Sequence, residues 1–193
     1  YQSALEASKK DRNPIRHTLA GTARVYPKGS AVISMLGYVL GEEQWKRVLN
    51  HYLKTHAYGN VETNDLIQAI QDVLGKDLSW FFVQWIYRGG EPEYTVHYED
   101  LTYSNGSRST EIAIEQTHQQ DELVRLFKMP IVFEVHYTDG TFDTMTDWID
   151  EQFEVVKVPN KNSKQIAFVL FDPNARILKS VKFKKGFNEL SAQ

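Results

Sequence analysis

The histidines and carboxylates are the residues whose side chains could bind a metal or move protons, and their spacing forms no complete site. The sequence of 193 residues contains no HExxH zinc motif, no Walker phosphate loop and no GxSxG nucleophile motif. His51 and His56 lie five residues apart in a predicted helix, so they point to different faces and make a poor metal pair. The other histidines stand singly, which favours surface or structural roles.

Three aspartates, Asp139, Asp143 and Asp147, recur along a predicted hairpin. Their spacing does not match an EF-hand calcium loop, so a solvated face is the better interpretation. The chain has no cysteine, which excludes disulfides and thiolate metal sites. The aromatic residues of segment 80–85 are interpreted as core or interface residues. Composition and periodicity alone therefore support no specific enzyme.

One short run, residues 25–31 (VYPKGSA), stands at the entrance to a predicted helix. From spacing alone, Tyr26 would be a packing residue at the helix entry. Pro27 fixes φ directly after the tyrosine and would stiffen its placement. Lys28 is expected either to extend its amine into water or to pair with an acidic group outside this chain. Gly29 is expected to let the backbone pass close to a neighbour.

The composition indicates a globular protein of one or two domains, with 41% hydrophobic and 24% charged residues. The net charge of -3 gives no electrostatic case for binding nucleic acid. No apolar run approaches the roughly 20 residues that span a bilayer. No signal peptide is evident, and the expectation is a soluble chain of unknown location. The chain begins at Tyr1 rather than Met, which suggests a piece of a longer protein.

The first half of the chain has the apolar periodicity of helices. The pattern predicts four of them, ended or separated by glycines such as Gly41 and Gly75. Thr63 is the expected N-cap of the third helix, and Asp77 that of the fourth. The predicted apolar faces include Ile33 in the first helix and Leu53 in the second. The predicted helices cover residues 29–40, 42–56, 63–74 and about 78–86.

The second half changes to the alternating pattern of β-strands. Two turns that contain glycine, at residues 104–107 and 138–141, separate neighbouring strands. Seven short strands predict an immunoglobulin-like antiparallel β-sandwich. The expected fold class is therefore α+β, with a helical domain over residues 1–92 and a sandwich domain over 93–193. The strands are expected near residues 94–98, 112–114, 131–137, 142–148, 153–158, 165–171 and 177–183.

An ordered set of short motifs resembles a known family. Over about 80 residues this set is similar to the back half of the catalytic domain of the aminopeptidase N-type (gluzincin) zinc metallopeptidases. Within residues 93–193, FKMP (127–130) and FDPN (171–174) resemble recurring pieces of the sandwich domain that follows it. The motifs of the first half are NPI (13–15), YPKGSA (26–31), LGEE (40–43), GKDL (75–78), FFVQW (81–85) and GEP (90–92).

The resemblance implies the back of a thermolysin-like catalytic domain and a definite chemistry. In such enzymes a zinc ion held by two His and one Glu activates water for peptide hydrolysis. The resemblance assigns to Tyr26 the hydrogen bond that stabilises the oxyanion of the tetrahedral intermediate. No residue of this chain is expected to hold the zinc or another cofactor. The fragment alone is therefore expected to be inactive, and its partners would be peptide substrates and the missing N-terminal part of its own catalytic domain.

A non-catalytic interaction module, a sandwich with a helical cap, is the alternative. An HExxH motif upstream of Tyr1 would favour the peptidase, and its absence would favour the module. Helices suited to pack against a missing half-domain should leave apolar surface exposed, and such surface promotes association. Self-association of the fragment is therefore expected.

Overall fold

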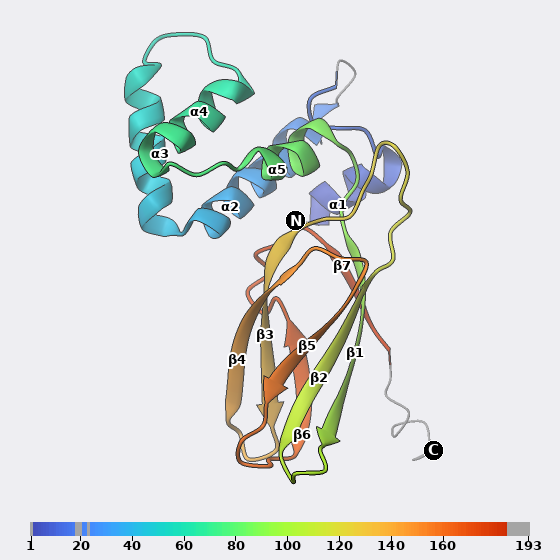
Figure 1. Ribbon diagram of the computed structural model, residues 1–193. Helices are drawn as coiled ribbons and strands as arrows, with labels where there is room; N and C mark the ends of the chain where they lie inside the picture. Colours follow the sequence, from blue (N-terminus) through green and yellow to red (C-terminus); the bar gives the residue numbers. More distant parts are fainter. Residues whose placement is uncertain (1, 18–20, 23, 185–193) are drawn as a thin grey trace. The chain divides into compact units, whose positions relative to one another are not determined.

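The computed structural model describes residues 2–17, 21–22 and 24–184, and it divides the chain into two units (Figure 1). Unit 1 is Tyr1–Gly90 and is helical, whereas unit 2 is Glu91–Gln193 and is built of strands. The α+β fold class is therefore confirmed.

Unit 1 contains five α-helices and two single turns of π-helix among its described residues. Three of the four predicted helices have the expected bounds to within a residue, and α1 lies ahead of the predicted set. None of the described helices is both long and apolar enough to cross a bilayer. The elements are α1 (Gln2–Lys10), η1 (Arg24–Lys28), α2 (Gly29–Leu40), α3 (Glu42–Thr55), α4 (Thr63–Leu74), α5 (Ser79–Phe82) and η2 (Val83–Tyr87).

The ends of these helices follow from local chemistry. Gly41 takes φ +82° between α2 and α3, in the region that favours glycine, and its N–H donates to the Gly37 carbonyl at 2.9 Å. The prediction that Thr63 is the N-cap of α4 is wrong by one residue. Glu62 is the N-cap of α4, since its side chain accepts the Asp65 N–H while Asp65 Oδ2 accepts the Glu62 N–H at 2.7 Å. This reciprocal capping box satisfies two backbone donors at once.

The core of unit 1 is formed mainly by side chains from α2, α4, α5 and η2, with Val48 of α3 also fully buried. Met35, Ile70, Phe81 and Trp85 are almost completely buried. The predicted apolar faces are wrong in part. Ile33 is 42% exposed and Leu53 is 64% exposed, because no described element covers them.

Unit 2 is a sandwich of a four-stranded sheet, in the order β5-β2-β1-β7, and a three-stranded sheet, in the order β4-β3-β6. The rings of Tyr94 and Phe171 come from different sheets, and their centroids lie 5.0 Å apart in the core. The strands are β1 (Glu93–Thr102), β2 (Arg108–Gln116), β3 (Met129–Tyr137), β4 (Phe142–Ile149), β5 (Phe153–Pro159), β6 (Ile166–Phe171) and β7 (Ser180–Phe183).

All seven predicted strands are present, and the last differs from its prediction. The other strand pairs are antiparallel, but β7 lies parallel to β1. It also begins at Ser180 rather than at Ile177. The reason lies in the preceding loop, where the Asp172 carboxylate accepts the N–H groups of Arg176 and Ile177 at 2.9 and 3.0 Å. These bonds hold the segment in a turn before the strand can start.

The exposed tyrosine and its two buried anchors

Tyr26 lies in the middle of the π-helical turn η1, and its side chain is 71% exposed. Arg24 and Lys28, two residues to either side, are 4% and 1% exposed. Side chains four residues apart in a helical turn lie on one side of it, and the residue midway between them points away. The turn therefore buries two basic side chains and presents the tyrosine outward. A packing role for Tyr26 within unit 1 does not agree with this exposure.

Arg24 ties the turn to the segment that precedes it. Its guanidinium donates from Nη1 to the Pro14 carbonyl at 3.2 Å and forms an ion pair with the Asp11 carboxylate. Asp11 is itself oriented, because its Oδ1 accepts the Asn13 N–H at 3.0 Å. Burial lowers the pKa of the Arg24 guanidinium, since desolvation disfavours the charged form.

Lys28 ties the same turn to the end of unit 1. Its Nζ donates to the Gly90 carbonyl at 2.7 Å, across 62 positions of sequence. Gly90 has φ +71°, and its N–H donates to the Arg12 carbonyl at 3.0 Å. The expectation that Lys28 extends into water is therefore wrong, because this segment offers a backbone acceptor inside the unit.

The backbone of the turn is also held from within. The N–H groups of Arg24 and Val25 both donate to the Gly21 carbonyl, at 3.0 and 3.1 Å. The Ser30 hydroxyl donates to the Pro27 carbonyl at 3.0 Å. The expected close backbone approach at Gly29 is wrong, since a Cβ there would meet nothing within 4 Å among the described residues.

Among the histidines and hairpin carboxylates, His136 and Asp139 make clear local contacts in unit 2. His136 stacks between Phe142 and Phe168, with ring centroids at 5.0 and 4.5 Å. The pKa of Asp139 falls to about 2, chiefly because Thr141 donates hydrogen bonds to it and Lys164 lies beside it. Within residues 2–17, 21–22 and 24–184, no three His, Asp or Glu side chains gather as a metal site requires.

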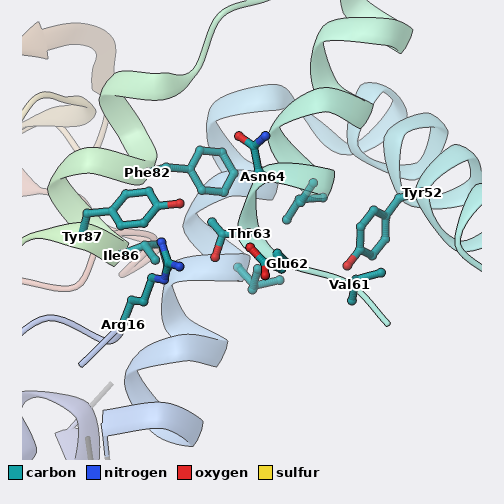
Figure 2. Close-up of a pocket in the computed structure, with 11 residues that line it drawn as sticks. Arg16, Tyr52, Val61, Glu62, Thr63, Asn64, Phe82, Ile86 and Tyr87 are labelled. Carbon is teal, nitrogen blue, oxygen red and sulfur yellow. The ribbon is translucent and has the colours of Figure 1, made fainter. Parts of the chain in front are cut away.

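A broad pocket of about 770 Å³ opens between α2, α3, α4 and η2 of unit 1. Figure 2 shows Arg16, Phe82 and Tyr87 on one side of it, with Tyr52 and Val61 on the other. The Arg16 guanidinium lies over the Tyr87 ring, 5.5 Å from its centroid. Tyr26 is not among the lining residues, so the pocket and the exposed tyrosine are separate features.

The fold of this chain matches part of a solved protein structure. The crystal structure of Legionella pneumophila aminopeptidase A in complex with aspartic acid matches 88% of this chain with a TM-score of 0.69. The sequence identity is 18%, and the match covers 19% of that protein chain. The fold described above is thus the fold of one part of an aminopeptidase structure.

The sequence of the first half of the chain is similar to one peptidase family. Residues 10–85 match the Peptidase family M1 domain. Probable aminopeptidase 1 of Saccharolobus solfataricus is 27% identical over 87% of this chain, and the leucyl aminopeptidase of that organism is 28% identical over 96%. Aminopeptidase N of Lactococcus lactis subsp. cremoris is 39% identical over 44% of this chain and 10% of its own length. Residues 10–85 are thus similar to the M1 peptidase family, as the motifs of this segment predicted.

The chain corresponds to only a part of each of these relatives. The chain covers 21% and 22% of the two Saccharolobus proteins, or about a fifth of their length. The matched region of the M1 domain contains η1 with Tyr26, Arg24 and Lys28.

Sequence reasoning singled out Tyr26 and did not find Arg24 or Asp11. A usable signal was present in the printed sequence. Arg24 and Lys28 are four residues apart on either side of the tyrosine. This spacing places them on the same side of a helical turn, where two basic groups need acceptors.

Proposed function

We propose that this chain supplies the oxyanion-stabilising tyrosine of a zinc-dependent aminopeptidase that removes N-terminal residues from peptides. The observation that carries the proposal is the outward presentation of Tyr26 on a turn whose flanking side chains are buried and tied down. The match of residues 10–85 to the Peptidase family M1 domain supports the reaction class. The peptide substrate and the rest of the catalytic domain belong to the same proposal.

The chemistry suits a tyrosine. A phenol has a reference pKa of about 10, so it is a hydrogen-bond donor at neutral pH. When water attacks a peptide carbonyl, negative charge develops on the carbonyl oxygen. A donor already aimed at that position stabilises the transition state by roughly 2.7–4 kcal/mol, by analogy with other oxyanion sites. An exposed hydroxyl on an anchored turn is accessible to a substrate carbonyl, and the anchored backbone limits the positions that this hydroxyl can take.

The zinc that the family resemblance implies has no site among the described residues. The imidazoles of the described part are dispersed, and several of its carboxylates are engaged in caps and ion pairs, such as Asp65 and Asp172. The proposed role of this chain is therefore limited to the hydrogen bond from Tyr26. It includes no step at the metal.

The test is Tyr26→Phe in the full-length enzyme that contains this chain. The substitution removes only the phenolic hydroxyl, so kcat should fall about a hundredfold or more with zinc content unchanged. Steady-state kinetics on an N-terminal residue amide and metal analysis measure the two quantities.

Tyr58→Phe is a matched control for this experiment. Tyr58 is fully exposed in the same unit, and the substitution removes the same hydroxyl there. The kcat of the Tyr58→Phe enzyme should therefore equal that of the wild type. An unchanged kcat for Tyr26→Phe would refute the proposed role.

A further inference from the structure

We infer that Lys28 is a positioning residue for Tyr26, with the Gly90 carbonyl as its anchor and Arg24 as the second point of attachment. This inference rests on the proposed function of Tyr26. It concerns how the tyrosine is held, which the motif alone does not say.

The side chain of Tyr26 has no attachment of its own in the described part of the chain. No hydrogen bond, ion pair or ring contact there involves its phenol, and most of its surface is exposed. The backbone of η1 therefore sets the Cα–Cβ direction from which this side chain extends. Whatever fixes that backbone limits the positions that the hydroxyl can reach.

The backbone of η1 is fixed from two directions. Arg24 joins it to residues 11–14, and Lys28 joins it to Gly90. The two attachment segments are joined to each other, since the Gly90 N–H donates to the Arg12 carbonyl at 3.0 Å. The contacts form a closed loop, in which displacement of the turn on one side strains the bonds on the other.

A buried lysine is a costly way to fill space. An apolar side chain of similar length would occupy the same volume without desolvating an amine. Only a donor can engage the Gly90 carbonyl, whose direction is set by the left-handed backbone at φ +71°. The hydrogen bond at 2.7 Å therefore specifies position as well as packing.

Accurate placement matters because an oxyanion donor acts over a narrow range. Such donors work at about 2.7–3.1 Å from the developing charge. A displacement of about 1 Å by a distant change can lower a rate about a hundredfold. Loss of the Lys28 anchor should therefore reduce kcat through Tyr26, while substrate binding in the ground state changes little.

The test is a double-mutant cycle in the full-length enzyme with Lys28→Met and Tyr26→Phe. Lys28→Met removes the donor and keeps an unbranched side chain that is one atom shorter. We expect it to lower kcat about tenfold or more in the wild-type background, with KM and zinc content little changed. In the Tyr26→Phe background it should lower kcat by less than about twofold, because the hydroxyl that it positions is already absent.

Two further variants serve as a rescue and as a control for this experiment. Lys28→Arg keeps a donor and should restore part of the kcat that Lys28→Met loses. Lys46→Met removes an exposed lysine that pairs with Glu42 at 2.6 Å on α3, and it should leave kcat unchanged. If Lys28→Met does not fold, Lys28→Arg in both backgrounds gives a milder form of the cycle, in which the smaller loss of kcat should again be confined to the background that keeps the Tyr26 hydroxyl.

The outcomes separate this inference from the proposed function. Equal losses of kcat in both backgrounds, or no loss from either Lys28 variant, would overturn the positioning role and leave that of Tyr26 intact. No loss from Tyr26→Phe would refute the proposed function and the inference with it.

Discussion

Single residues of this chain can organise whole loops, and Asp172 is the clearest case in unit 2. Its carboxylate accepts two backbone N–H groups and forms an ion pair with Lys179, with the two side chains 1% and 9% exposed. Its own N–H donates to the Val132 carbonyl at 2.7 Å. A buried ion pair adds little net stability, but the loss of one partner leaves an uncompensated charge.

Asp172→Asn should therefore be strongly destabilising. Asn tolerates the left-handed backbone at φ +51°, so the substitution chiefly removes the charge. We expect the free energy of unfolding to fall by about 3 kcal/mol, as measured by urea denaturation. Asp150→Asn is the control, because Asp150 forms an exposed pair with Lys128 at 3.1 Å and should change stability by less than about 1 kcal/mol. Equal effects of the two variants would show that burial of the Asp172 pair does not matter.

At the scale of elements, the contact between α2 and α3 depends on one glycine. A Cβ on Gly37 would lie 2.8 Å from Cδ1 and 3.1 Å from Nε1 of Trp45. The indole of α3 is thus seated against the backbone of α2. Glycine in a helix interior lowers stability by about 1 kcal/mol relative to alanine, so here close packing opposes helix propensity.

Gly37→Ala decides which of these effects is larger. We expect a net loss of about 1–3 kcal/mol in the free energy of unfolding, because the Trp45 ring must move. In a Trp45→Leu background the same substitution should become neutral or stabilising, since the space is free. Gly29→Ala in the same helix is the control, because a Cβ there meets nothing within 4 Å among the described residues. Thermal denaturation of the variants would show the pattern, and a stabilised Gly37→Ala protein in the wild-type background would contradict it.

The bounds of the elements were largely predictable, for reasons visible in the sequence. Apolar residues at helical spacing, stopped by Gly41 and Gly75, predicted α2, α3 and α4. Strict alternation predicted β3, in which every second residue is buried. Such patterns report local preference and which face is apolar.

The remaining features depend on contacts between distant residues. The parallel pairing of β7 joins residues 180–183 to residues 93–96 of β1, which no periodicity reveals. The burial of Lys28 depends on a carbonyl 62 positions away. At the candidate site, the family motif singled out Tyr26 and the spacing of Arg24 and Lys28 was visible, while their partners Asp11 and Gly90 required the fold. The role of Tyr26 itself stays a prediction.

At the scale of the whole molecule, unit 1 carries several large apolar side chains on its surface. Ile33, Leu53 and Val61 are 42%, 64% and 46% exposed. The chain covers about a fifth of its longer relatives, which offers a reason for helices with an uncovered apolar face. Large exposed apolar patches favour association.

We therefore expect this chain, expressed by itself, to self-associate through unit 1. The weight-average mass from static light scattering should rise above that of the 22.3 kDa monomer as protein concentration increases. Leu53→Glu should shift the mass toward the monomer, because a charge on the exposed face of α3 opposes its burial. Lys54→Gln, at the neighbouring exposed position, should leave the association as it is. A monomeric mass over the whole concentration range would show that the exposed side chains of α3 do not suffice for association, and an equal effect of the two variants would place the contact elsewhere.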